Sequence, residues 1–121
     1  MKQNNALYPQ CPIRNVLARI GDKWSMLILH ALTSQTAPMR FSEVQRNIQD
    51  ASPKMLTTSL RNLEEDGIVS RTVYPEVPPR VEYSITPRGE ELMNSMQPLI
   101  AWADSHMEEI LRERMDKVNR Q

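Results

Sequence analysis

The chain has 121 residues, with 15 basic side chains (lysine and arginine), 15 acidic ones and a single cysteine. This length fits one domain, and a formal net charge of zero excludes a uniformly basic surface that would bind any polyanion without specificity. One cysteine excludes an intramolecular disulfide framework and the usual zinc sites. The N-terminus lacks the apolar core of a signal peptide, and the longest apolar run, Met26–Leu29, is too short to cross a bilayer. We therefore expect a cytoplasmic protein that does not contact a membrane.

Hydrophobic spacing predicts two helices after a polar segment, residues 1–10, which we expect to be a flexible tail. Pro12 suits the first position of a helix because its missing N–H costs nothing there, and Gly21 ends that helix. Asp22 is predicted to cap a second helix over 23–33. The apolar positions, spaced three and four residues apart, are Ile13, Val16, Leu17 and Ile20 in the first helix, and Trp24, Leu27, Ile28, Ala31 and Leu32 in the second.

Two further helices follow a short extended piece over residues 39–41. Ser42 is predicted to cap a helix over 43–48. Ser52, with a proline directly after it, begins the next helix, which runs over 53–66. The residues that this helix turns inward are Leu56, Leu60 and Leu63.

A β-hairpin and a long helix complete the chain. Strands are predicted over 68–74, which is rich in β-branched residues, and over 80–85, which alternates cleanly. Three prolines between them make a stiff tip rather than a tight turn. A helix should then extend over about 87–116, and Pro98 predicts a kink or a break near Ser95.

Two helices joined by a short turn and followed by a hairpin are the winged helix-turn-helix arrangement, with the helix over 53–66 as its recognition helix. We expect a mainly α fold with a small β-hairpin (α+β), as a single domain over 11–121.

The last helix has more apolar surface than the remaining elements can cover, although its first turns fit against their own domain. We therefore expect a homodimer through the N- and C-terminal helices, with its recognition helices roughly 34 Å apart on an inverted repeat. The apolar positions of the last helix are Leu92, Met93, Met96, Leu99, Ile100, Ala103, Met107, Ile110 and Leu111.

The chain closely resembles the HxlR family of bacterial transcriptional regulators over about residues 11–103. The resemblance implies a cytoplasmic, homodimeric, DNA-binding regulator, which we classify as a repressor. It also implies that the cysteine can serve as a sensor, because several members of the family sense oxidants or electrophiles through a cysteine at the position of Cys11. The motifs that carry it are Cys11-Pro12, Gly21-Asp-Lys-Trp24, Arg40-Phe41-Ser-Glu-Val44, Ile48, Ser52-Pro-Lys-Met-Leu56, Leu60-Arg-Asn-Leu-Glu-Glu-Asp-Gly67, Tyr74-Pro-Glu-Val-Pro-Pro-Arg-Val-Glu-Tyr83, Thr86 and Gly89.

The residues themselves also indicate DNA contact. Residues 40–61 hold four basic side chains against two acidic ones, and the acids of the recognition helix stand at its end, over 64–66. The polar and basic residues opposite the inward leucines can form hydrogen bonds with base edges and ion pairs with phosphates. The alternative interpretation is that they are the ordinary solvated face of an amphipathic helix. The candidate double-stranded DNA contacts are Arg40, Ser42, Ser52, Lys54, Met55, Thr57, Thr58, Arg61, Arg71 and Arg80.

Several of these residues have an alternative role that the pattern favours about equally. Ser42 can hold a phosphate at a helix N-terminus or act as a plain N-cap. Met55 can touch a base or fill a gap in the core. Arg71 can assist Arg80, which the proline tip aims at phosphate or a minor groove, or pair across the strands with Glu82.

Cys11 has a structural and a functional interpretation. Its place before Pro12 at a helix N-terminus, with Arg14 one turn on, favours a lowered pKa and hence a thiolate open to oxidation or alkylation by a small oxidant or electrophile. The alternative is a small buried apolar residue, which is the common fate of a free cysteine. With the family resemblance taken into account, the two interpretations of Cys11 have about equal support.

Other functions have less support. His30 and His106 lack ligand partners at metal spacing, so we expect no metal and no cofactor. The acidic run over 64–66 has no nucleophile beside it, and Cys11 has no paired histidine, so we expect no enzyme. The alternatives that stay open are a winged-helix protein-interaction module without DNA binding, and a regulator switched by a small-molecule ligand instead of thiol chemistry.

Overall fold

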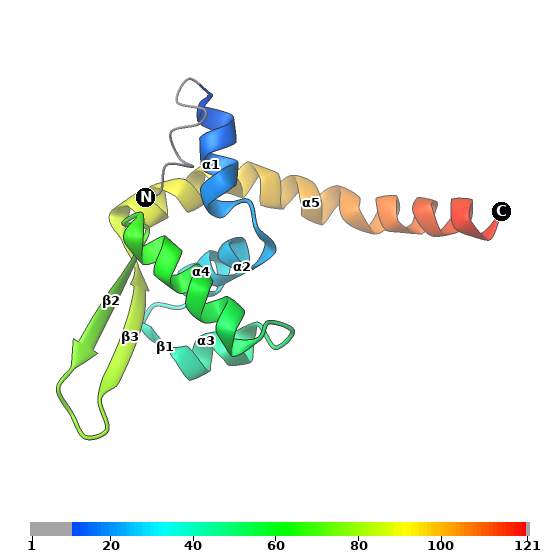
Figure 1. Ribbon diagram of the computed structural model, residues 1–121. Helices are drawn as coiled ribbons and strands as arrows, with labels where there is room; N and C mark the ends of the chain where they lie inside the picture. The colour runs from blue at the N-terminus through cyan, green and yellow to red at the C-terminus, as the bar shows by residue number, and fades with distance from the viewer. Residues whose placement is uncertain (1–10, 121) are drawn as a thin grey trace. The chain divides into compact units, whose positions relative to one another are not determined.

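The computed structural model describes residues 11–120, and the tail expected over 1–10 lies outside the described residues (Figure 1). The chain divides into two compact units, the first ending at Glu90 and the second beginning at Glu91. The order of elements confirms the predicted α+β winged helix-turn-helix fold. In the described chain, the elements are α1 (Pro12–Ile20), α2 (Lys23–Thr33), β1 (Met39–Arg40), α3 (Phe41–Asn47), α4 (Pro53–Glu65), β2 (Val69–Tyr74), β3 (Arg80–Ile85) and α5 (Pro87–Asn119).

Side-chain caps begin the helices at the predicted places. The Asp22 carboxylate accepts a hydrogen bond of 2.8 Å from the backbone N–H of Ser25. The Ser52 hydroxyl accepts one of 3.1 Å from the backbone N–H of Met55, and Pro53 occupies the first helical position. These caps satisfy donors that have no partner inside the helix, which is why α2 and α4 start where the sequence predicted.

The prediction that Ser42 caps α3 is wrong. The helix begins at Phe41, so Arg40 is the N-cap residue and Ser42 is the second helical residue. The Glu43 carboxylate reaches back and accepts a hydrogen bond of 2.8 Å from the backbone N–H of Arg40. That bond gives the backbone N–H of the N-cap residue an acceptor from the first turn of the same helix. The Ser42 hydroxyl therefore has no capping role.

A three-stranded antiparallel sheet supports the wing, with strand order β1-β3-β2. The register pairs Val69 with Ile85 and Tyr74 with Arg80 along the hairpin. The short strand β1 adds Met39 opposite Tyr83. Figure 1 shows the tip of the hairpin extending beyond α3 and α4, and β1 pairs with β3 only as far toward the tip as Glu82.

The core lies between α2, α3, α4 and the base of the sheet. Leu56, Leu60 and Leu63 are buried as predicted. Two assignments in α2 were wrong: Leu27 is 38% exposed, whereas Leu29 is fully buried. Because α2 is the central helix of this unit, it contacts neighbours around most of its circumference, and a single apolar stripe does not describe it.

The end of α4 is held from two other elements. Gly67 follows with a φ of +74°, a left-handed conformation that glycine adopts without strain. Arg19 of α1 forms an ion pair with the Asp66 side chain through two hydrogen bonds, and Arg88 donates a hydrogen bond of 2.8 Å to the Asp66 carbonyl. The Thr86 hydroxyl donates one of 2.6 Å to the Gly67 carbonyl. The recognition helix is therefore fixed at its C-terminal end, away from its polar first turns.

Helix α5 is continuous from Pro87 to Asn119, so the break expected near Ser95 does not occur. Pro98 lies inside this helix, where it removes one backbone donor without ending the helix. None of the helices in residues 11–120 is both long and apolar enough to cross a bilayer.

Candidate nucleic-acid interface

The helix-turn-helix consists of α3 and α4, and the wing is the hairpin of β2 and β3 (Figure 1). Lys54, Thr58 and Arg61 project from the face of α4 opposite its buried leucines. Nine of the ten predicted contact residues are exposed and the tenth, Arg80, is half-buried. The exposed ones are Arg40, Ser42, Ser52, Lys54, Met55, Thr57, Thr58, Arg61 and Arg71.

The first turns of α4 use part of their polar chemistry internally. The Ser52 hydroxyl caps the helix, and the Thr57 hydroxyl donates a hydrogen bond of 2.8 Å to the Pro53 carbonyl. Both oxygens retain acceptor capacity, and the Thr57 methyl group is available for an apolar contact. Met55 is 43% exposed, so it does not fill a gap in the core.

Arg80 is held by the wing itself. Its guanidinium stacks over the Tyr74 ring at 4.1 Å, and Nη2 lies 3.1 Å from a Glu76 carboxylate oxygen. Nε is buried and lies 3.7 Å from a Glu82 carboxylate oxygen. To contact DNA, the Arg80 guanidinium would have to replace its two carboxylate partners with a phosphate.

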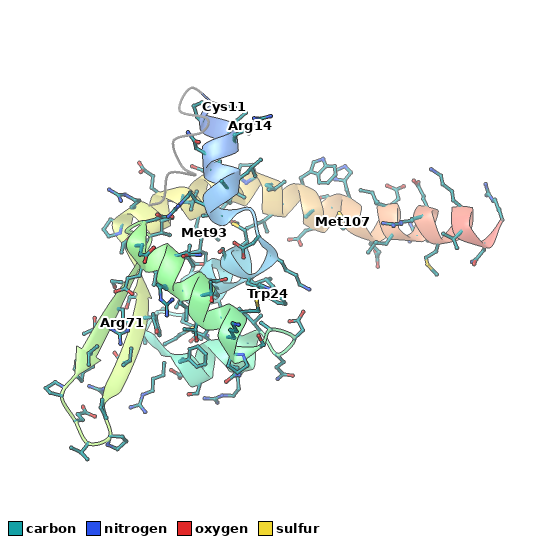
Figure 2. The ribbon with its side chains drawn as sticks, in the orientation of Figure 1. Cys11, Arg14, Trp24, Arg71, Met93 and Met107 are labelled. Atoms are coloured by element: carbon teal, nitrogen blue, oxygen red, sulfur yellow. The ribbon has the colours of Figure 1, made fainter. Side chains whose placement is uncertain are left out.

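Arg71 differs from Arg80, because no carboxylate within residues 11–120 forms an ion pair with it. The strand register places it opposite Tyr83, whereas Glu82 stands opposite Thr72, on the other face of the sheet. The alternative of a cross-strand pair between Arg71 and Glu82 is therefore wrong. Figure 2 labels Arg71 on the hairpin.

A surface cavity of about 260 Å³ lies between α4 and the wing. Two of the predicted contact arginines, Arg61 and Arg71, line it together with Thr57, and two residues that the sequence did not single out for DNA contact, Glu64 and Tyr83, complete it. Helical spacing placed Glu64 beside Arg61, but only the strand register brings Arg71 and Tyr83 to the same place.

The acidic end of α4 is partly neutralised within the fold. The hydrogen bond from Arg19 to Asp66 raises the pKa of the Arg19 guanidinium above its already high usual value. Asp66 thus faces α1 and not the exposed side of α4, while Glu64 and Glu65 remain exposed.

Cys11 lies at the N-cap position of α1, and its side chain is half-buried. Its carbonyl accepts a hydrogen bond of 3.1 Å from the backbone N–H of Asn15, and its thiol does not cap the helix. Figure 2 shows it at the N-terminal end of α1. The apolar stripe predicted for this helix is mostly uncovered, since Ile13 is 69% exposed and Leu17 59%. Cys11 therefore begins a helix that presents an apolar face to its surroundings.

The helix-turn-helix, the hairpin wing and the outward polar face of α4 together define a winged helix-turn-helix protein. The sequence profile of the HxlR-like helix-turn-helix family matches residues 19–111. The chain belongs to this family of transcriptional regulators.

Three similar proteins illustrate the family. The uncharacterized HTH-type transcriptional regulator YtfH of Escherichia coli is 42% identical over 117 residues, which cover 97% of this chain and 91% of YtfH. The crystal structure of diamide-treated YodB from B. subtilis matches with a TM-score of 0.67 and 37% identity, over 81% of this chain and 96% of YodB. The redox regulator HypR in its oxidized form matches with a TM-score of 0.69 and 40% identity, over 79% of this chain and 97% of HypR.

Proposed function

We propose that this protein is a sequence-specific DNA-binding regulator that represses transcription and acts as a homodimer on an inverted-repeat operator. The observation that carries the proposal is the exposed face of α4, where Lys54, Thr58 and Arg61 stand opposite three buried leucines. On an arbitrary helix this pattern would be an ordinary solvated face. Here the helix lies between a turn and a wing, the position that enters the major groove in winged helix-turn-helix proteins.

The dimer is supported by uncovered apolar surface in each unit. In the first, Ile13 and Leu17 of α1 are more than half exposed. In the second, α5 exposes Leu111, Met115 and Val118. Apolar residues in a repeated helical spacing are typical of a face that a second chain covers.

Thiol chemistry at Cys11 is the switch that we propose for this regulator. YodB has been crystallised after diamide treatment, and HypR is named a redox regulator. Cys11 precedes the residues that the family profile matches, so the inference rests on those two relatives and on its place at the start of α1, whose apolar face we assign to the dimer. A small oxidant or electrophile that modifies Cys11 would thus act where two protomers meet and change the spacing of their recognition helices.

The DNA-binding proposal is tested by measuring affinity for duplexes from the DNA upstream of the protein's own coding sequence, over a range of salt concentrations. Binding should weaken steeply as salt rises, and Lys54→Ala should lower the magnitude of the salt slope by about 2, because the homodimer loses one phosphate contact in each protomer. Arg120→Ala, an equal loss of charge at the end of the described chain, is the matched control and should leave the slope unchanged. If the wild-type protein binds no duplex, or binds without salt dependence, the protein-interaction alternative replaces this proposal.

A further inference from the structure

The cavity between α4 and the wing has the composition of an anion site. Thr57, Arg61 and Glu64 are spaced by four and three residues, so they share one side of α4. Arg71 and Tyr83 stand directly opposite each other in the strand register, so they share one face of the hairpin. The cavity therefore has one wall from the recognition helix and one from the wing, and each wall contributes an arginine.

These two arginines differ from Arg19 and Arg80 in their partners. Arg19 is paired with Asp66, and Arg80 with Glu76 and Glu82. Within residues 11–120, neither Arg61 nor Arg71 has a hydrogen-bond or ion-pair partner. Two unpaired guanidinium groups on one cavity repel each other, and an oxyanion between them would remove that repulsion.

The charge and shape of the site favour a phosphodiester. A guanidinium presents parallel N–H donors that match two oxygens of a phosphate, and the Tyr83 hydroxyl adds a further donor. Glu64 on the same cavity leaves two positive charges against one negative charge. A surplus of one positive charge complements the single charge of a phosphodiester better than the nearly double charge of a free phosphate or a phosphate monoester.

The geometry of docking brings a phosphodiester to this place. When a recognition helix lies in the major groove and the wing follows the adjacent minor groove, the strand that separates the two grooves passes between them. The cavity lies between these same two elements. We propose that Arg61 and Arg71 together bind one phosphodiester of the DNA backbone in this cavity, an inference that rests on the proposed DNA-binding function.

This role makes Arg61 a residue that positions the helix instead of one that reads a base. Phosphate contacts fix the register of a protein on the duplex and carry no direct sequence information. Loss of Arg61 should therefore weaken binding to operator and non-operator duplexes by the same factor. A base contact would instead lower the affinity for the operator alone and relax specificity at one position.

The test is a double-mutant cycle with Arg61→Ala and Arg71→Ala on the same upstream duplex. Each single variant should lose about 10-fold or more in affinity, as expected for a hydrogen bond to a charged group. The double variant should lose less than the product of the two factors, because both side chains hold the same group. The magnitude of the salt slope of the dimer should fall by about 2 in the double variant, not by about 4, since one phosphate contact is lost in each half-site. Arg120→Ala is the charge-matched control, and unfolding midpoints verify that the variants fold.

Neutral methylphosphonates placed singly along the duplex identify the phosphate. At one position per half-site the wild type should lose affinity, while the double variant should lose none. If every methylphosphonate affects the wild type and the double variant alike, the site assignment is wrong although DNA binding stands. If the wild type binds no duplex at all, both proposals fail.

A free anion is the other source of the same chemistry, and a separate measurement distinguishes it. Inorganic phosphate, exchanged for chloride at constant ionic strength without DNA, should raise the unfolding midpoint of the wild type and the double variant equally. A stabilisation that requires Arg61 and Arg71 would overturn the phosphodiester assignment and identify a site for a free phosphate.

Discussion

At the scale of single residues, Cys11 combines a half-buried thiol with the start of a helix whose apolar face is exposed. Because the chain has only this cysteine, a disulfide at it must join a second molecule. Diamide takes two electrons and two protons from two thiols as their sulfurs bond, and a quinone adds to one thiolate through a new carbon–sulfur bond. Cys11→Ser should keep operator affinity within about twofold and abolish the release of DNA by diamide or a quinone, as measured by a mobility shift. Intact mass spectrometry should show a disulfide-linked dimer, or one quinone per chain, in the wild type alone.

Cys11→Ala separates chemistry from packing, because it removes the thiol and leaves a small apolar side chain. Both variants should be unresponsive to either reagent. A diamide response that persists in Cys11→Ser would show that the switch lies elsewhere in the chain, and the thiol would then be structural.

Among the elements, α1 and α4 are joined by the ion pair of Arg19 and Asp66, whose side chains are 33% and 21% exposed. Arg19→Ala should lower the free energy of unfolding by about 1–2 kcal/mol, because it leaves a partly buried carboxylate without its strongest donor. Urea unfolding followed by circular dichroism measures this loss. The matched control is Lys23→Ala, which removes an ion pair to Asp50 whose two side chains are each 63% exposed. It should cost less than about 0.5 kcal/mol, and equal costs for the two variants would contradict the importance given to the α1–α4 pair.

Local signals in the sequence were enough to predict most of the elements, whereas the contacts between elements were not. The caps by Asp22 and Ser52 depend on neighbours three residues away, so residue type and spacing predicted them. The start of α3 was misplaced because Glu43, and not Ser42, supplies the capping oxygen. The cavity between α4 and the wing depends on the register of strands far from α4 in the sequence, which hydrophobic alternation does not specify.

At the scale of the whole molecule, the proposed recognition of an inverted-repeat operator depends on the proposed dimer. A net charge of zero presents no long-range repulsion between two copies. Helix α5 exposes Ile110, Leu111, Met115 and Val118 by 39%, 52%, 60% and 60%, at spacings of one, four and three residues. We expect light scattering to give twice the mass of one chain, since a partner chain would bury the apolar area that these residues expose.

Leu111→Glu places a charge at the centre of that apolar face and should convert the dimer to a monomer, because an unpaired buried carboxylate is strongly unfavourable in an interface. The monomer should keep its helical content, as judged by circular dichroism. Its affinity for the full inverted repeat should fall to that for a single half-site, since linking two half-sites raises the effective concentration at the second. Glu113→Gln, which changes a polar side chain two residues away on the same helix, should leave both mass and affinity unchanged. A wild-type monomer that binds the full repeat tightly, or a Leu111→Glu protein that stays dimeric, would rule out α5 as the dimer interface.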